Sequence, residues 1–412
     1  MDALRVIADD LTGACDVGVE LLPWPAGIAV QPQPTDVPPA GVPGTALCVR
    51  NTQSRTLAPA AAAARVTAAL AEARSGWSGI VLKKIDTALR GQLGAEIDAA
   101  MDVLGIDEAF VLPAIPEVGR TTEQGRQMIG GVPIDQTAFA RDPQNPIHDA
   151  SVAAAIEATG RRRATSIGLD AVRDKERLAS AIASARDAGA PVVVCDAETD
   201  ADLERSVRVL LGRPRPLLLV GSTGLARALR RVLGTEMGVR VRPPVTQRPT
   251  DTGVLVVAGS AHPATRAQVE RAKARGVLDV VTVDFGRRPQ EAGAAAAELV
   301  GVGRAVVLVS PETLAPEGSD TVLAALRGAA LTALAKVRPS GLALIGGETA
   351  YQVLEGLGHP ALWLESRPAP LVVRSRLIAG PYAGVPLVTK GGSSGAPELL
   401  AQIIRTLVRG GR

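Results

Sequence analysis

The chain has 412 residues, of which 46% are hydrophobic, and a formal charge of +3 from 45 Lys and Arg against 42 Asp and Glu. This length and composition are typical of a globular protein with room for two domains. The near balance of charge and the 2% aromatic content exclude the usual nucleic-acid-binding surface, which needs a basic face and rings that stack on bases. This charge and composition are better suited to binding an anionic small molecule than a nucleic acid.

The cysteines, histidines and apolar runs exclude further classes. Cys15, Cys48 and Cys195 are odd in number and far apart, which predicts a cytoplasmic protein without disulfides. The three histidines form no zinc-ligand motif, so no protein-built metal site is predicted, and any metal is expected to be Mg²⁺ that arrives with a nucleotide. No apolar run reaches the roughly 18 residues that span a bilayer and no export leader opens the chain, so we expect neither membrane insertion nor export.

Short apolar runs alternate with helical patterns from end to end, which predicts stacked βα units and parallel sheets. In the first half the expected strands lie near residues 4–8, 46–49, 79–83, 109–112, 191–195 and 216–220. Ala-rich helices, such as 59–74 and 175–188, are expected between them. The stretch from Pro113 to Pro146 has no strong periodicity and is long for an idle connection, so we interpret it as a substrate loop or lid.

A Pro-rich stretch divides the chain. Residues 238–253 contain three prolines and interrupt every periodic pattern, which is typical of a domain linker. Beyond it, strands are expected near residues 254–258, 279–283, 305–309, 342–345 and 385–389. We therefore predict an α/β protein with two domains, residues 1–237 and 254–412, each a mostly parallel sheet flanked by helices.

The segment from Arg5 to Leu22 is the most informative of the first half. An apolar strand runs directly into Asp9 and Asp10 and then into an amphipathic helix that begins near Thr12 and Gly13. Ligands of open α/β sheets bind at the carboxyl ends of strands, which favours a site here. The alternative is that Asp10 or Thr12 only caps the helix. Residues 81–91 repeat the design, and this repetition favours a function for both segments.

The charged residues near these strand ends are of the types that bind a polyhydroxy acid. The basic residues, which can pair with a carboxylate, are Arg55, Lys83, Lys84 and Arg90. The acidic residues, which can hydrogen-bond hydroxyl groups or accept a proton from one, are Asp9, Asp10 and Asp86. The alternatives are a solvated strand end for Lys83 and Lys84, and a helix-edge ion pair for Arg90.

Three strands of the second half lead into small-residue turns at expected helix starts. The turns are residues 259–262, 346–349 and 390–395. Backbone amides at a helix start, with the helix dipole behind them, bind phosphate, and glycine lets a ligand approach the backbone closely. One such turn is ordinary turn chemistry, whereas three in one domain favour a phosphate site.

The usual phosphate-binding fingerprints are absent from the sequence. No Lys precedes a Ser or Thr, so there is no P-loop, no GxGxxG follows a strand, and the residues around His148 do not form a protein-kinase catalytic loop. Gly391 to Gly395 matches the GxSxG pattern of a hydrolase nucleophile elbow. However, an α/β-hydrolase needs a histidine after that serine, and the last histidine is His359.

Six segments, in order along almost the whole chain, carry a more specific signal. They are IADDLTGACD at 7–16, KKIDTALRGQLGAEIDAAM at 83–101, LPAIPEVGRTTEQG at 112–125, GVPIDQTAFARDPQNPI at 131–147, GGET at 346–349 and KGGSSGAPELL at 390–400. Together they resemble the four-carbon acid sugar kinases, a family long catalogued as a domain of unknown function. The first two segments are rarely found together outside that family.

The resemblance implies that the N-terminal domain binds a four-carbon sugar acid, that the C-terminal domain binds ATP and that the active site lies in the cleft between them. It implies transfer of the γ-phosphoryl group to the 4-hydroxyl of threonate, erythronate or 3-oxo-tetronate, with Mg²⁺ accompanying ATP and Asp10 or Asp86 accepting the hydroxyl proton. The expected substrate-binding residues are Asp9, Asp10, Arg55, Lys84, Ile85, Asp86, Thr87 and Arg90. The expected ATP-binding residues are Ser260, Gly346, Gly347, Glu348, Thr349, Gly391, Gly392, Ser393 and Gly395. A homodimer is a further expectation.

Two residues depart from the family pattern. Ser394 stands where an aromatic residue is usual, and Ala88 replaces a common hydroxyl residue, although Thr87 keeps the preceding hydroxyl. Two other functions are compatible with the residues. An aldolase or dehydrogenase of sugar acids would use the same acid-binding half without consuming ATP, and a non-catalytic binding module would bind the acid and leave the phosphate turns empty.

Overall fold

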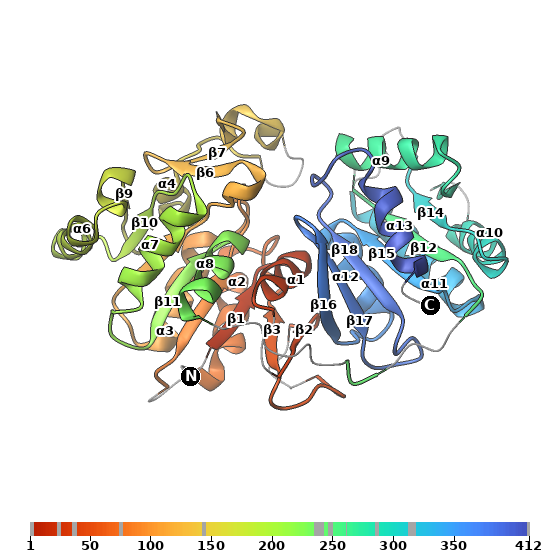
Figure 1. Ribbon diagram of the computed structural model, residues 1–412, viewed down its shortest axis with the longest axis horizontal. Helices are drawn as coiled ribbons and strands as arrows, with labels where there is room; N and C mark the ends of the chain where they lie inside the picture. The colour runs from red at the N-terminus through yellow and green to blue at the C-terminus, as the bar shows by residue number, and fades with distance from the viewer. Residues whose placement is uncertain are drawn as a thin grey trace. The chain divides into compact units, whose positions relative to one another are not determined.

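The structure, a computed structural model, describes residues 4–22, 26–34, 39–73, 77–141, 146–234, 243–245, 250–260, 262–284, 288–311 and 319–409. The chain forms two compact units (Figure 1). The first comprises Met1–Ala26, Gln33–Val37 and Leu47–Arg240, and the second Gly27–Pro32, Pro38–Ala46 and Val241–Arg412. Most of the expected linker, 238–253, lies outside the described residues.

The sheet of the first unit is parallel. Its strands lie in the spatial order β3 (Leu47–Asn51), β1 (Leu4–Ala8), β4 (Ile80–Lys84), β11 (Leu217–Gly221), β5 (Ala109–Leu112), β10 (Val192–Cys195) and β9 (Ala164–Ile167). Ala8 pairs with Asn51 on one side and with Lys84 on the other. Because these three strands end at one level, the residues that follow them meet at one edge of the sheet.

Helices cover both faces of this sheet. Alternate strand residues point to opposite faces, and Ile7, Val81 and Val111 pack in one core with α2 (Pro59–Ala69), α3 (Leu93–Leu104) and α4 (Val152–Glu157). The opposite face carries α1 (Leu11–Glu20), α8 (Thr223–Leu233) and α7 (Asp200–Leu210), which pack in a row. Two more helices follow β9 in sequence, α5 (Leu169–Val172) and α6 (Lys175–Asp187).

The segment 113–146 has regular structure in most of its described residues, although its sequence shows no periodicity, and its role as a substrate loop or lid stays a prediction. It forms an antiparallel sheet of β6 (Arg120–Glu123), β7 (Arg126–Ile129) and β8 (Val132–Pro133) with short 3₁₀ turns. Its hairpins turn at Gln124-Gly125 and Gly130-Gly131, all with positive φ, which matches the twist of paired strands. Strands of two to four residues are too short to show a periodicity. Residues 142–145 lie outside the described residues.

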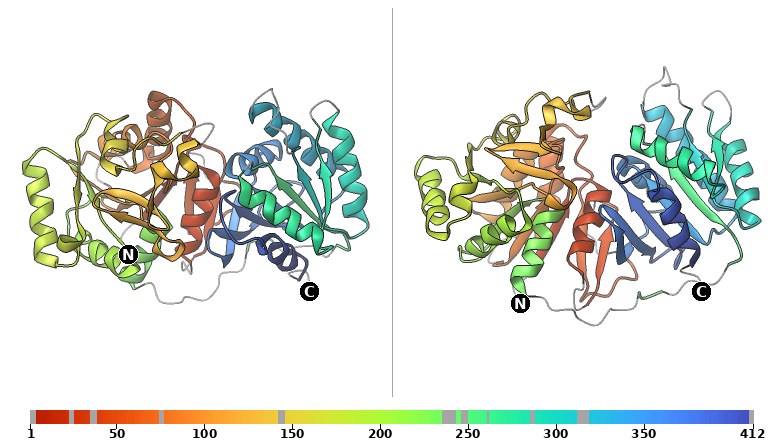
Figure 2. Two further views of the ribbon diagram at one scale, coloured as in Figure 1. Left: turned by 90° about the horizontal axis from the view of Figure 1, so that it is seen from above. Right: turned by 45° about the horizontal axis from the view of Figure 1, so that its top comes forward.

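The second unit has a sheet of mixed direction that is mostly parallel. Its parallel strands lie in the order β13 (Asp279–Thr282), β14 (Val306–Val309), β12 (Val254–Ala258), β15 (Gly341–Ile345) and β18 (Pro386–Lys390). The helices α9 (Pro263–Ala274) and α13 (Leu399–Arg409) pack against each other, as do α10 (Pro289–Gly301), α11 (Ser319–Lys336) and α12 (Gly347–Gly356) (Figure 2). The expected α/β class with two mostly parallel sheets is thus confirmed.

Three antiparallel strands complete the second sheet and were not expected from the sequence. They are β17 (Val372–Leu377), β16 (Leu362–Ala369) and β2 (Ile28–Gln31). β16 carries two register shifts, which disrupt the alternation that would have marked it as a strand. β2 comes from the beginning of the chain and pairs Val30 with Leu362 and Ala29 with Trp363.

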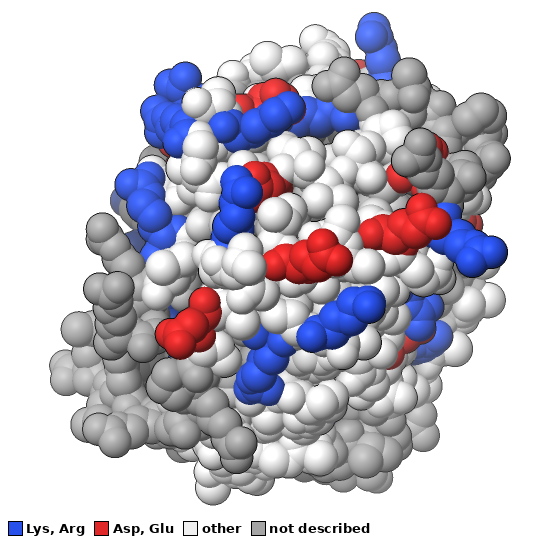
Figure 3. Space-filling model, turned by 90° about the vertical axis from the view of Figure 1, so that its right-hand side faces the viewer, with Lys and Arg blue, Asp and Glu red and all other residues white. Residues whose placement is uncertain are grey.

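Several broad expectations can be compared with the described residues. Cys15, Cys48 and Cys195, all among the described residues, form no disulfide bond. Among the described helices, none combines the length and apolar character that a membrane span requires. On the face drawn in Figure 3, basic and acidic side chains are interspersed, and no patch of one sign covers it.

Candidate functional site

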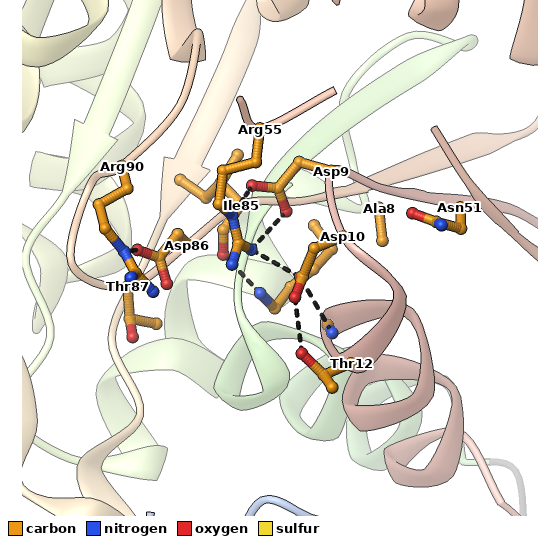
Figure 4. A network of polar contacts seen from close by, with 12 residues as sticks. Ala8, Asp9, Asp10, Thr12, Asn51, Arg55, Ile85, Asp86, Thr87 and Arg90 are labelled. Atoms are coloured by element: carbon orange, nitrogen blue, oxygen red, sulfur yellow. Dashed lines mark hydrogen bonds and ion pairs between the residues drawn. The ribbon is translucent and has the colours of Figure 1, made fainter. Parts of the chain in front are cut away.

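The predicted substrate residues of the first unit gather at the carboxyl edge of β3, β1 and β4 (Figure 4). Asp9 and Asp10 follow β1, the segment from Ile85 to Thr87 follows β4, and Arg55 lies shortly after β3. The chain reverses its direction of strand addition around β1, with β3 on one side and β4 on the other. Such a reversal is where open α/β sheets bind ligands.

Arg55 holds the two aspartates of β1 together. Its Nε lies 2.8 Å from Asp9 Oδ2, and its Nη2 lies 3.0 Å from Asp9 Oδ1 and 2.6 Å from Asp10 Oδ1. Burial alone would raise the pKa of Asp9, but Arg55, with smaller effects from Lys83 and Lys84, lowers it overall. Asp9 is therefore a buried, ionised carboxylate, and most of the Arg55 fork is engaged by protein.

Asp10 also caps α1, so the capping alternative and an ion pair both hold for this residue. Its Oδ1 accepts a hydrogen bond from the Gly13 amide at 3.0 Å, and its Oδ2 accepts one from Thr12 Oγ1 at 2.6 Å. A Cβ on Gly13 would lie 2.4 Å from Asp10 Oδ1 and 3.0 Å from Lys84 Nζ. Glycine at this position lets the helix start, the carboxylate and the ammonium lie together.

The two lysines of β4 are buried, so a solvated strand end is wrong for both. Lys83 Nζ lies 2.6 Å from Glu96 Oε2 on α3, with the two side chains 0% and 2% exposed. Lys84 Nζ donates a hydrogen bond to the Ile85 carbonyl at 2.7 Å. Ile85 places its side chain in the core, and its amide donates to the Gly221 carbonyl at 2.9 Å. A substrate contact at Ile85 stays a prediction and would have to involve its main chain.

Beyond β4 the chain forms a polar turn before α3. Arg90 Nε lies 2.6 Å from Asp86 Oδ2, and its guanidinium lies 5.3 Å from the centre of the Phe139 ring. The ion pair was an expected alternative, but it lies in this turn and not on a helix edge. Burial opposes ionisation of Asp86, yet Arg90, Arg55 and Lys84 together lower its pKa far below the usual range. Ala88, one departure from the family pattern, is fully buried.

Three residues of this cluster were not singled out from the sequence. Glu96 is the partner of Lys83, Arg120 of β6 donates a hydrogen bond to Thr87 Oγ1, and Asp16 lies on α1. Burial raises the pKa of Asp16 to about 7, Lys84 opposes the shift, and Asp10 and Glu20 add to it. A signal was present, because Asp16 interrupts a small and apolar stretch of helix and Arg120 lies within a segment that resembles the family.

The raised pKa of Asp16 predicts a pH dependence of stability. Between pH 4 and pH 7 the folded chain holds the Asp16 proton that the unfolded chain has released, so this residue stabilises the fold at low pH and the contribution is lost as pH rises through about 7. We expect Asp16→Asn to raise Tm relative to the wild type more at pH 8 than at pH 5, in ligand-free thermal unfolding. Asp187→Asn, at an exposed position, is the control. An equal shift at both pH values would contradict the assignment.

The predicted ATP residues of the second unit gather in the same way at the ends of β12, β15 and β18. Ala258 pairs with Ile345, and Ile345 pairs with Lys390, so the turns that follow are level. α9 fastens the last turn, because Thr265 Oγ1 donates to the Gly392 carbonyl at 2.8 Å and Gln268 Nε2 donates to the Ser394 carbonyl at 3.0 Å. The three turns lie around the reversal of strand order at β12.

Two of these turns lead directly into a helix, as we expected. His262, the last residue of the turn 259–262, is the N-cap of α9. Gly346, with φ of +107°, is the N-cap of α12, so Gly347, Glu348 and Thr349 form its first turn. The segment from Gly391 to Gly395 precedes α13 by several residues, so the expectation that it begins a helix was wrong. Within the described residues, the amides of Gly392 and Ser393 donate no hydrogen bond. They are donors available to a ligand.

The side chain of Lys390 stabilises the turn formed by residues 391–395. Its side chain is 0% exposed, and its Nζ donates to the Gly391 carbonyl at 2.7 Å and to the Ser394 carbonyl at 2.9 Å. Burial lowers the pKa of Lys390 to about 8. The Ser394 carbonyl thus accepts from both Lys390 and Gln268. A main-chain role of this kind does not depend on the aromatic side chain that is usual at this position.

Acidic side chains are few in the three turns that follow β12, β15 and β18. Among the described residues, no group of three or more His, Cys, Asp or Glu side chains could hold a metal ion. Glu348 is the acidic residue of the three turns.

Comparisons with known proteins assign both clusters to domains. Residues 4–229 match the family described as a sugar-binding N-terminal domain, and residues 255–400 match a nucleotide-binding C-terminal domain. A D-threonate kinase of Salmonella typhimurium is 31% identical over 97% of each chain. The chain belongs to the four-carbon acid sugar kinase family. In this family, a 3-oxo-tetronate kinase of Methylobacterium radiotolerans is 31% identical over 97% of this chain and 95% of its own.

A solved structure supports the fold of this family member independently. A protein from Salmonella typhimurium LT2 superposes with a TM-score of 0.78 over 98% of this chain and 99% of its own, at 23% identity. The polar cluster around Asp9 lies within the residues matched by the sugar-binding domain, and the glycine turns lie within those matched by the nucleotide-binding domain.

Proposed function

We propose that this kinase-family protein uses ATP to phosphorylate the 4-hydroxyl of a four-carbon sugar acid such as threonate, erythronate or 3-oxo-tetronate. The observation that carries the proposal is the pair of matched sites. A charged cluster ends three strands of the sugar-binding half, and three glycine turns end three strands of the nucleotide-binding half. Relatives named for D-threonate and 3-oxo-tetronate kinase activity match over nearly the whole chain.

The second unit supplies phosphate donors in this proposal. The amides of Gly392 and Ser393, with the first turn of α12, bind the phosphates of ATP without a P-loop lysine. Mg²⁺ usually binds through one or two carboxylates together with nucleotide phosphates, so Glu348 fits as the residue that would hold it. The ion would neutralise charge on the transferred phosphoryl group.

The first unit orients the acceptor hydroxyl. Phosphoryl transfer passes through a loose transition state, so positioning contributes more than base strength. This suits Asp86, whose lowered pKa makes it a weak base but a fixed hydrogen-bond acceptor, and Asp10, whose geometry is set by Thr12, Gly13 and Arg55. We propose that Asp10 or Asp86 accepts the hydroxyl proton. Full turnover by both Asp10→Asn and Asp86→Asn would exclude this role.

An ADP-release assay with ATP and Mg²⁺ tests the function. The panel contains D- and L-threonate, D- and L-erythronate and 3-oxo-tetronates, and we expect release that depends on one of these acids. Silence across the panel, with ATP still raising Tm, would place the acceptor outside the tetronates. Silence without ATP protection would favour a non-catalytic sugar-acid-binding module, and acid conversion without ADP release would favour an aldolase or dehydrogenase. We also propose a cytoplasmic location and a homodimer, the latter testable by light scattering.

Gly392→Ala gives a sharp test of the nucleotide site. A Cβ at Gly392 would lie 1.9 Å from Ser260 Oγ and 2.5 Å from Ser260 Cβ, so the turn or Ser260 must move. We expect ATP affinity, measured with a fluorescent nucleotide analogue, to fall at least about tenfold, the loss of one charge-assisted hydrogen bond. Gly301→Ala is the matched control, because a Cβ there meets nothing within 4 Å. Equal affinity in the two variants would place the phosphates elsewhere.

A further inference from the structure

Most cations of the first cluster are already neutralised by carboxylates of the chain. Arg55 is paired with Asp9 and Asp10, Lys83 with Glu96, and Arg90 with Asp86. The sequence had suggested these same basic residues for pairing with the carboxylate of a substrate. The structure instead engages three of them with protein, so the acid group of a ligand needs another partner.

Two cations of the cluster, Lys84 and Arg120, have no carboxylate within ion-pair distance among the described residues. Lys84 is buried and its ammonium donates to the Ile85 carbonyl. Arg120 is only partly buried, and its guanidinium donates to the Thr87 hydroxyl. A guanidinium presents several donors in a planar fork that matches a carboxylate, whereas an ammonium is a point charge. Arg120 is therefore the better candidate for binding an acid.

The surroundings of Arg120 favour an incoming anion. Burial lowers the pKa of Arg120 and nearby Arg90 adds to this, while Asp86 and Asp16 oppose the shift. Because Thr87 Oγ1 accepts from Arg120, its own O–H remains able to donate to a ligand. By contrast, a carboxylate placed at Asp9 and Asp10 would meet two carboxylates that already share Arg55.

We infer that Arg120, assisted by the Thr87 hydroxyl, binds the carboxylate of the sugar acid and thereby makes the enzyme select acids over neutral polyols. The inference rests on the proposed function. It also assigns direction to the substrate, with the acid end at Arg120 and the hydroxyl groups toward Asp10 and Asp86.

The test compares each accepted tetronate with the tetritol of the same configuration, which carries CH₂OH in place of the carboxylate. We expect the wild type to prefer the acid, and Arg120→Gln to lower kcat/KM for the acid by about 10- to 100-fold through KM while leaving the tetritol within about twofold. The kcat/KM of Arg120→Lys for the acid should lie between the values of the wild type and of Arg120→Gln, because lysine keeps the positive charge but lacks the planar guanidinium. Arg126→Gln, on neighbouring β7 and paired with Asp135, is the control and should keep the acid preference.

Other outcomes would overturn the inference. An equal loss for acid and tetritol would make Arg120 a residue for the hydroxyl end or for the fold, which circular dichroism separates. A raised KM for ATP with an unchanged acid preference would assign Arg120 to the transferred phosphoryl group. If the wild type phosphorylates no tetronate, the proposed function fails, and calorimetric binding of acid against tetritol to wild type and Arg120→Gln still decides the role of Arg120. If the wild type binds the acid no more tightly than the tetritol in this calorimetric assay, the proposed role of Arg120 is rejected.

Discussion

Lys83→Met is expected to lower the free energy of unfolding by about 3–5 kcal/mol, as measured by chemical denaturation at pH 8. The variant leaves Glu96, 2% exposed, without the ammonium that lies 2.6 Å away. Burial already raises the pKa of Glu96 although Lys83 opposes the shift, so without Lys83 the carboxylate should take up a proton. The loss should therefore be smaller at pH 5 than at pH 8.

A double variant separates the cost of an unpaired charge from the value of the pair. Lys83→Met with Glu96→Leu removes both charges, and we expect it to be clearly more stable than either single variant. Arg208→Met is the control for an exposed pair, since Arg208 and Glu204 are 3.1 Å apart on the surface of α7, and it should cost under about 1 kcal/mol. A double variant as unstable as Lys83→Met would show that side-chain packing, not charge, is responsible.

Arg55→Met is expected to have the largest effect on turnover. It removes the hydrogen bonds that hold Asp9 and Asp10 in place and leaves both carboxylates without their guanidinium. We expect destabilisation of about 3–5 kcal/mol and a loss of about 100-fold or more in kcat/KM for the acid. ADP release and urea unfolding measure the two effects.

The pH profile of Arg55→Met provides its internal check. In the wild type the lowered pKa of Asp9 stabilises the fold above the ordinary aspartate pKa, and the contribution is lost as pH falls through the folded value. Without Arg55, burial should raise that pKa, so the variant should lose more stability at pH 8 than at pH 5. Arg186→Met, at an exposed ion pair, is the control. A loss independent of pH would contradict the ion-pair role.

Much of the candidate site could be predicted from the sequence, because the carboxyl ends of parallel strands can be recognised in it. An apolar run followed by Asp9 and Asp10, or by Gly346 and Gly347, marks the edge of a parallel sheet where ligands bind. The sequence could not reveal that Arg55 is engaged by carboxylates of the chain itself, and it offered an ion pair for Arg90 only as an alternative. Such pairing depends on side-chain geometry across strands, as does the meeting of Arg120 with Thr87, which are 33 residues apart.

Most parallel strands of the fold were also predictable, since most of them are buried apolar runs of four or five residues. Most of the strands that were missed lack this signal. β6 and β7 are short and polar, β9 has one buried residue, and β16 is interrupted by register shifts. β2 is apolar and buried but has only four residues beside a Pro-rich stretch. In each case the strand is specified by its partner in space rather than by its own pattern.

The placement of β2 affects how the chain can be divided into domains and how the second unit folds during synthesis. Gly27, with φ of +83°, leads into β2 and lies so close to Trp363 that a Cβ there would be 2.2 Å from the indole. The outermost strand of the second unit, β2, thus lies in Gly27–Pro32, whereas the main part of that unit is Val241–Arg412. The ribosome therefore synthesises β2 long before the strand with which it pairs. No single cut yields the nucleotide-binding half intact. During synthesis that strand must wait for its partner, and gene fusions that exchange this half at one crossover would leave β16 with an unpaired edge.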